Sequence, residues 1–273
     1  MTVVAVCQRA GITRQNYYAM RCQRQRRTVD EELIVKLIRR ERRDQPRLGG
    51  RKLKHMLKGD LAEAGVKIGR DRMFGVLRAN GLLVERKRGR ARTTNSRHCL
   101  PVFRNLVAGE TPDGPHQILV SDVTYIGTDE GFLYAALITD MFSRKIVGRY
   151  IGDSLEAEGC IRALRLAMVQ LPATAHPTHH SDRGCQYCCH AYVKLLQDRG
   201  LSVSMTEVLH CYENAMAERV NGILKQEYEM DRRFKTKVQA IAAFEQAVWL
   251  YNHRRPHLAL NYRTPAQVHE LAA

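Results

Sequence analysis

Five short runs of apolar and β-branched residues follow one another after residue 101, and each predicts a strand. The runs cover 116–127, 132–142, 145–151, a few residues ending near His180, and 201–205. Turn-forming residues at 128–131 and 143–144 separate the first three runs, which predicts three antiparallel strands in series. Helical periodicity predicts helices over 155–170, 191–199, 214–225 and 237–252. The last helix carries Trp249, the only tryptophan, which we expect in the core.

This order of strands and helices is that of the ribonuclease H-like fold, an α/β architecture. We therefore expect a ribonuclease H-like core domain over residues 113–273, including a C-terminal helix and tail. A fold order alone does not define a function, so the chemistry must come from particular side chains.

The helix predicted at 214–225 has two faces. One stripe is apolar and consists of Met216, Ala217, Val220, Ile223 and Leu224. The opposite stripe consists of Asn214, Glu218, Asn221 and Lys225. A polar stripe of this kind is ordinarily a solvated helix face. Carboxylates elsewhere in the chain favour a second interpretation, in which the stripe faces a polar site.

The first hundred residues predict only helices. Residues 3–10 and 14–23 form two helices joined by a glycine turn, with Thr13 as N-cap, the outline of a partial helix-turn-helix over 1–28. Helices at 30–43, 51–61 and 70–80, the last ended by Gly81, predict a trihelical DNA-binding domain over 29–84. The alternative is a three-helix domain whose charges only keep it soluble.

Charge divides the chain into two parts. The net charge is +16, and residues 1–100 hold 26 Lys and Arg against 9 Asp and Glu. A basic front half predicts a polyanion ligand, and nucleic acid fits better than a membrane surface because the basic residues run through several elements. The basic linker, 85–112, begins with an arginine-dense stretch that predicts phosphate contacts. A merely solubilising linker is the alternative.

The candidate DNA-binding residues in this front half are Arg51, Lys52, Arg86, Lys87, Arg88 and Arg90. No apolar run is long enough to span a bilayer, and the N-terminus does not fit a signal peptide, so we expect no membrane and a cytoplasmic, nucleoid-associated protein. The eight cysteines lack paired zinc-ligand spacing and are expected to be free thiols.

Three carboxylates stand at points that the predicted fold brings together. Asp122 interrupts an apolar strand, where a charge is costly unless it is paired or metal-bound. Asp182 follows the fourth strand, and Glu218 lies in the two-faced helix. Carboxylates prefer hard cations such as Mg²⁺ (or Mn²⁺), and two such ions can promote phosphodiester displacement. Local pairing of Asp122 with a lysine or arginine is the alternative.

The same residues lie in motifs that resemble a known family. The motifs are V-S-D-V-T-Y-I around Asp122, H-S-D-R-G-C-Q-Y around Asp182, Y-E-N-A-M-A-E-R-V-N-G-I-L-K around Glu218, and the tail Y-N-H-R-R-P-H-L-A-L-N-Y-R-T-P-A. The chain resembles the second-reading-frame transposases of the insertion-sequence-three family, in the retroviral-integrase superfamily. This resemblance implies an integrase catalytic core in which Asp122, Asp182 and Glu218 are the catalytic, metal-binding triad. It also implies that Lys225 contacts DNA.

The chain departs from the family pattern at three places, none of them a triad carboxylate. Leu119 stands where the family usually has tryptophan, Glu213 replaces a frequent aspartate, and Leu48-Gly49-Gly50 replaces an aromatic-Gly-aromatic run. These departures leave the activity of this copy open.

The resemblance implies a transposase that cuts DNA at element ends, freeing a 3′-hydroxyl, and transfers the strand into target DNA with two Mg²⁺ or Mn²⁺ ions. The implied partners are the terminal repeats, the target DNA, further copies of the chain and an upstream-frame protein or fusion partner. Two other hypotheses remain: a catalytically silent DNA-binding regulator or repurposed copy, and a ribonuclease H-like nuclease. The first would bind terminal DNA equally well with or without magnesium.

Overall fold

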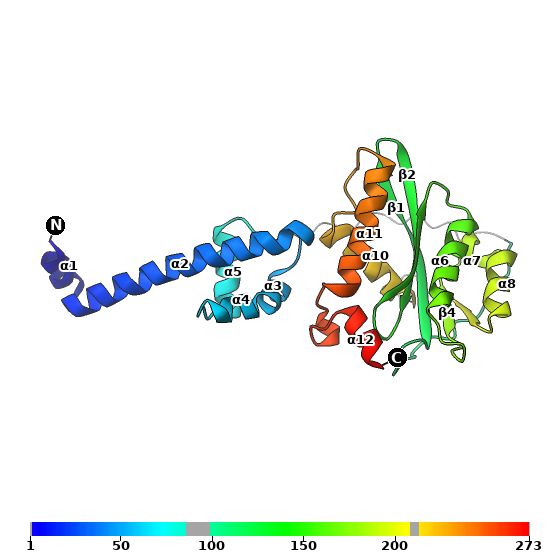
Figure 1. Cartoon of the computed structure of the whole chain (residues 1–273), viewed down its shortest axis with the longest axis horizontal. Helices are drawn as coiled ribbons and strands as arrows, with labels where there is room; N and C mark the ends of the chain where they lie inside the picture. The colour runs from blue at the N-terminus through cyan, green and yellow to red at the C-terminus, as the bar shows by residue number, and fades with distance from the viewer. Residues whose placement is uncertain (1, 86–98, 208–212, 273) are drawn as a thin grey trace. The chain divides into compact units, whose positions relative to one another are not determined.

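The structure is a computed structural model that describes residues 2–85, 99–207 and 213–272. The chain divides into two compact units, residues 1–85 and 86–273. Figure 1 shows both units.

The N-terminal unit begins with α1 (Val3–Ala10), a turn and the long helix α2 (Arg14–Asp44). Gly11 ends α1 with a left-handed φ of 64°, a conformation that favours glycine. Thr13 caps α2, because its Oγ1 accepts a hydrogen bond of 3.1 Å from the backbone N–H of Asn16. The predicted turn and N-cap are therefore confirmed.

The prediction of separate helices at 14–23 and 30–43 was wrong, because α2 runs through both. The intervening residues 24–29 contain neither glycine nor proline, so nothing in them ends a helix. Thr28 is accommodated because its hydroxyl donates to the carbonyl oxygen of Arg24, at 3.0 Å. The boundary expected between residues 28 and 29 thus falls inside one helix.

Three short helices complete this unit: α3 (Gly50–Met56), α4 (Lys58–Glu63) and α5 (Arg70–Ala79). The single helix predicted at 51–61 is divided at Leu57, whose ψ of 3° leaves helical geometry while its side chain stays buried. Gly81 follows α5 with a φ of 65°, as predicted. The core of the unit contains Ile34, Ile38, Leu48, Leu53, Leu57, Met73 and Leu77, all fully buried.

Arg42 of α2 forms hydrogen bonds to two separate segments of this unit. Its guanidinium donates to the carbonyl oxygens of Leu82, at 2.7 Å, and Leu48, at 3.0 Å. One side chain of α2 thus fixes both the loop that precedes α3 and the chain that leaves α5.

The C-terminal unit is built on a mixed five-stranded sheet. Its strands are β1 (Ile118–Thr128), β2 (Gly131–Asp140), β3 (Ile146–Gly152), β4 (Thr178–Ser181) and β5 (Ser202–Met205). The spatial order is β3-β2-β1-β4-β5. The first three strands form the predicted antiparallel meander, whereas β4 pairs in parallel with both β1 and β5.

Helices cover both faces of this sheet (Figure 1). One face carries α6 (Ala157–Val169), α7 (Cys185–Cys188) and α8 (His190–Asp198). The other carries α10 (Ala215–Glu227) and α11 (Lys237–His253). A short 3₁₀ turn, Leu258–Leu260, and α12 (Pro265–Ala272) end the chain. This is the predicted ribonuclease H-like arrangement, in which two apolar cores sandwich the sheet.

The expectation that Trp249 belongs to the core was wrong, since its side chain is 55% exposed. The buried face of α11 is formed by Ala240, Phe244, Ala247, Val248 and Tyr251. Trp249 lies on the outer face, where its ring packs against His253 at a centroid distance of 5.4 Å. Within the described parts of the chain, no helix is long and apolar enough to cross a membrane.

The exposure of Trp249 predicts the fluorescence of the protein. Because it is the only tryptophan, the native emission should lie near that of indole in water and should be quenched efficiently by iodide. Trp249→Gln should change the free energy of unfolding by less than about 0.5 kcal/mol. Phe244→Ala, which empties a buried site on the same helix, should cost about 3–5 kcal/mol. Blue-shifted, unquenched native emission would contradict this assignment.

Candidate active site

The pairing of β1 with β4 brings two of the predicted carboxylates near each other. Ile118 pairs with Thr178, Leu119 with His179 and Val120 with His180. Asp122 follows the last of these pairs by two residues, and Asp182 directly follows the end of β4. The charge of Asp182 contributes to the raised pKa of Asp122, so the two carboxyls lie near each other. Asp122 points to the sheet face covered by α10, because side chains alternate along a strand and Val120 packs there against Ala217.

Helix α10 brings Glu218 to this place by two amide hydrogen bonds. Asn214 Nδ2 donates to the carbonyl oxygen of Ser121, at 3.0 Å. Asn221 Nδ2 donates to Oδ2 of Asp122, at 2.7 Å. Glu218 lies between the two asparagines in sequence, in the first turn of α10, and is exposed to solvent.

The polar stripe predicted on this helix is thus divided. Its two amides are buried and bind β1, while its carboxylate faces solvent. The apolar stripe packs on the sheet as predicted, through Ala217, Val220, Ile223 and Leu224.

Burial and neighbouring negative charge dominate the electrostatics of Asp122. Burial is the largest influence and raises the pKa of its carboxyl from 3.8 to about 7, with further contributions from the charges of Asp182 and Glu218. The hydrogen bonds from Asn221 and from the Val123 N–H, at 2.9 Å, oppose this rise. The three carboxylates therefore form one electrostatic unit, which we call the carboxylate triad.

A tight turn fixes the second carboxylate of the triad. Oδ1 of Asp182 accepts a hydrogen bond of 3.0 Å from the N–H of Gly184. A Cβ at position 184 would lie only 3.0 Å from that oxygen and 2.9 Å from Gln186 Oε1. A larger residue there would push on the carboxylate of Asp182 and the side chain of Gln186, and glycine avoids this contact. The Nε of Arg183 donates to the carbonyl oxygen of Thr206, at 2.6 Å, and holds the turn to the end of β5.

A buried hydrogen-bonded cluster lies behind the triad, on the opposite face of the sheet. Nε2 of His179 is 2.7 Å from Ser121 Oγ and 2.9 Å from the hydroxyl of Tyr192. Burial lowers the pKa of His179 to about 3, so the ring is neutral at physiological pH. This cluster links β1, β4 and α8 directly beneath the two aspartates. Sequence reasoning missed it, although the polar Ser121 and His179 within apolar strands were the available signal.

The triad has the donor chemistry of a divalent-cation site. Carboxylate oxygens are the ligands that Mg²⁺ and Mn²⁺ prefer, and a cation would offset the mutual repulsion that helps to raise the pKa of Asp122. In residues 2–85, 99–207 and 213–272, however, no three His, Cys, Asp or Glu side chains are grouped closely enough to hold a metal ion. The carboxylate oxygens of Asp122 and Asp182 instead accept hydrogen bonds from Asn221 and nearby N–H groups.

The predicted DNA-binding residues are distributed over both units. Arg51 is exposed on α3, whereas the side chain of Lys52 is buried against its own unit. Lys225 lies in the last turn of α10 and is half-buried. The remaining candidates, Arg86, Lys87, Arg88 and Arg90, lie outside the described residues.

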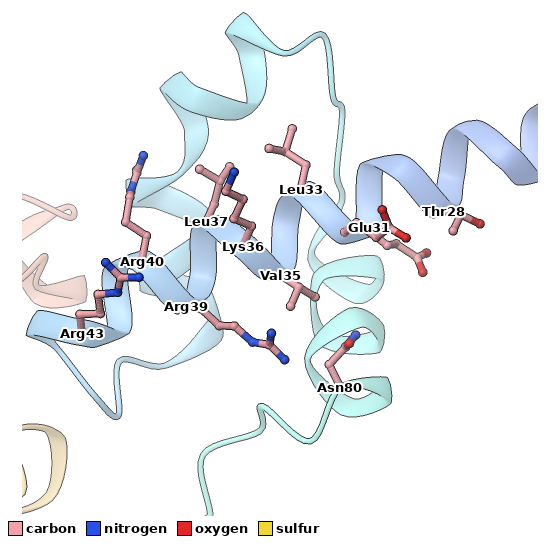
Figure 2. Close-up of a pocket in the computed structure, with 11 residues that line it drawn as sticks. Thr28, Glu31, Leu33, Val35, Lys36, Leu37, Arg39, Arg40, Arg43 and Asn80 are labelled. Atoms are coloured by element: carbon pink, nitrogen blue, oxygen red, sulfur yellow. The ribbon is translucent and has the colours of Figure 1, made fainter.

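A hollow along α2 carries no recognisable chemistry. Figure 2 shows its lining, which mixes Glu31 with Lys36, Arg39 and Arg43 and ends near Asn80. This mixture of acidic and basic side chains selects no ligand class, and the hollow belongs to the N-terminal unit, whereas the triad belongs to the C-terminal one.

Comparison with protein families defines the class of the C-terminal unit. One model of the integrase core domain matches residues 112–211, and a second integrase core domain model matches residues 199–265. Together these matches include all three carboxylates and helix α10. The unit is thus an integrase core, as predicted.

Whole-chain relatives identify the family. The chain is 34% identical over 276 residues to the uncharacterized 31 kDa protein of insertion element IS600 from Shigella sonnei, covering 98% of this chain and 100% of that protein. It is 31% identical over 208 residues to the transposase for insertion sequence element IS629 from Shigella sonnei, covering 76% and 70%. It is 28% identical over 273 residues to the transposase InsF for insertion sequence IS3A from Escherichia coli strain K12, covering 97% and 93%.

The chain belongs to the insertion-sequence-three (IS3) family of transposases. The resemblance noted from its motifs is thereby confirmed. Enzymes of this family cut DNA and transfer the cut strand, so the chain is a DNA-acting enzyme of the integrase superfamily.

The raised pKa of Asp122 predicts a pH-dependent effect of removing its charge. The folded state binds a proton at this carboxyl more tightly than the unfolded state, so the ionised carboxylate destabilises the fold increasingly between about pH 4 and 7. In EDTA, Asp122→Asn should therefore raise the melting temperature by several degrees at pH 8 and by progressively less as the pH falls to 4. Thermal unfolding followed by circular dichroism measures this. A difference independent of pH would contradict the assigned environment.

Proposed function

We propose that the carboxylate triad is the catalytic site of this transposase and that it holds divalent cations, Mg²⁺ or Mn²⁺, two at a time. The observation that supports this proposal most strongly is the coupling at Asp122, whose pKa is raised by burial and by the charges of Asp182 and Glu218. Asp122 is held largely away from water beside two other negative charges, and such a charge costs stability unless a cation or a proton offsets it. Perturbed carboxylates of this kind are concentrated at functional sites.

The proposed reaction has two steps, and no bond to the protein forms in either. Water attacks a phosphodiester at the element end and breaks the bond to the 3′ oxygen, which leaves a 3′-hydroxyl and a 5′-phosphate. The 3′-hydroxyl then attacks a phosphodiester of target DNA, so that one P–O bond forms as another breaks. When bound, the cations would acidify the attacking water or 3′-hydroxyl and stabilise the leaving oxygen.

The chain's own residues would supply position and electrostatics. Asp122 projects from β1, Asp182 directly follows the end of the adjacent strand β4, and Glu218 lies on α10. Lys225 lies further along that helix, where an ammonium can contact a phosphate of the element end. The buried Ser121–His179–Tyr192 cluster keeps β1 and β4 in register below the site.

The basic N-terminal unit and linker would bind DNA through the partial helix-turn-helix over 1–28 and the trihelical region over 29–84, which share helix α2, and through the linker over 85–112. Their charge supports this role, because residues 1–100 hold almost three basic side chains for each acidic one. Action on both ends of an element would require further copies of the chain, together with the upstream-frame protein or fusion. Such a protein would work in the cytoplasm, at the nucleoid.

Charge removal at the triad tests the proposal. Asp182→Asn keeps the size and the Gly184 hydrogen bond but removes a charge, and it should lower magnesium-dependent end cleavage and strand joining on the order of 10⁴-fold. The assay uses the full chain, alone or fused to the upstream-frame product, on DNA carrying the element's terminal repeats. Asp198→Asn is the matched control, because this exposed carboxylate at the end of α8 pairs with Lys194 of its own helix, at 3.1 Å. Full activity of Asp182→Asn would refute the triad.

A wild-type chain that binds terminal DNA without ever producing nicked or joined strands would favour the regulator hypothesis.

Salt dependence tests the linker. Replacing Arg86, Lys87, Arg88 and Arg90 together by alanine should weaken binding to DNA of any sequence. It should also reduce the slope of log K against log salt by about 0.9 for each phosphate that the variant no longer neutralises. Fluorescence anisotropy between low and moderate salt measures both quantities. An unchanged slope would show that these four residues do not contact phosphates.

A further inference from the structure

Each oxygen of the Asp122 carboxylate accepts a different hydrogen bond. Oδ1 accepts the N–H of Val123, at 2.9 Å, and Oδ2 accepts Nδ2 of Asn221, at 2.7 Å. A carboxylate on a strand otherwise turns readily about its last torsion, which has only broad minima. Two donors on opposite oxygens limit this rotation, and only Asn221 supplies its donor from a side chain.

We propose that Asn221 is a positioning residue that fixes the orientation of the Asp122 carboxylate for cation binding. The inference rests on the proposed function, since it assumes that the triad binds the ion. In this role Asn221 does more than hold helix α10 against the sheet. The carboxylates, and not Asn221, contact the ion.

The placement of Asn221 supports this role. Its side chain is only 5% exposed, and it follows Glu218 by three residues, so both lie on the same side of α10. One rigid helix thus carries the third carboxylate of the triad and the group that orients the first. Any displacement of α10 would alter both together, which makes the geometry of the triad depend on how this helix is seated.

Other contacts already attach α10 to the sheet. Ala217, Val220, Ile223 and Leu224 already bury the apolar face of the helix. Asn214 adds a hydrogen bond to the backbone of β1, at Ser121. The bond from Asn221 differs because its acceptor is a carboxylate with a proposed function, and removing a bond that orients a metal ligand commonly changes metal affinity 10–100-fold.

Asn214 provides a matched control. Both asparagines are buried on the same stripe of α10, and both donate one hydrogen bond through Nδ2 to β1. Asn221→Leu and Asn214→Leu each remove one donor at nearly constant side-chain volume. If the two residues act only in folding, neither substitution should alter the cation affinity of the folded protein.

The experiment measures Mn²⁺ binding to the full-length chain, free of DNA, by calorimetry and by electron paramagnetic resonance. Melting temperatures in EDTA first establish that each variant is folded at the temperature of the titration. Asn221→Leu should weaken Mn²⁺ binding by about 10-fold or more and alter the spectrum of the bound ion. Asn214→Leu should lower the melting temperature but retain the wild-type affinity and spectrum.

Asp182→Asn separates this inference from the proposed function. If wild type binds Mn²⁺ no better than Asp182→Asn, the triad is not the cation site, and both proposals fail. If wild type binds better than Asp182→Asn, the proposed site stands and the asparagine variants decide the inference. Wild-type affinity in folded Asn221→Leu, or an equal loss in both asparagine variants, would overturn the positioning role.

Discussion

The parallel pairing of β1 with β4 is the constraint on which the rest of the site depends. Three residue pairs end at Val120 and His180, so Asp122 and the end of β4, which Asp182 follows, lie near each other. The two faces of these strands carry different side chains. Ser121 and His179 share a buried cluster with Tyr192 on one face, while Asp122 accepts a hydrogen bond from Asn221 of α10 on the other. The apolar cores on both sides of the sheet therefore support a polar site at its centre.

A charged carboxylate at Asp122 lowers the stability of the fold, and neighbouring residues reduce this loss only in part. Burial raises the pKa of Asp122 to about 7, and its two hydrogen bonds only partly oppose this rise. Glu218 on α10 adds a further negative charge. Hydrogen bonds from Asn214 and Asn221 hold this helix against β1. The fold thus tolerates a group of like charges that it does not need for its own stability. This is the physical basis for proposing the triad as the catalytic site of this IS3-family transposase.

The sequence predicted the elements that depend on local pattern, and it failed where distant contacts decide. The meander, the two short later strands and α10 follow from apolar periodicity and turn residues, and the structure confirms them. Trp249 was misplaced because periodicity alone does not show which face of an all-round apolar helix meets the sheet. In α2, polar residues separate two apolar segments, so the sequence pattern predicted two helices where the structure has one continuous helix. For the site, a charge within an apolar strand revealed Asp122, but residue types could not show that Asn221 binds its carboxylate while Asn214 binds a backbone carbonyl.

The central claim is that Asp122, Asp182 and Glu218 together form a cation site, although their oxygens also accept hydrogen bonds from the protein. Anomalous scattering from crystals of the full-length chain grown with Mn²⁺ tests this claim most directly. We predict a peak about 2.0–2.3 Å from carboxylate oxygens of both Asp122 and Asp182, with Glu218 turned toward it. Mn²⁺ bound elsewhere on the chain, with no peak between β1, β4 and α10, would contradict it.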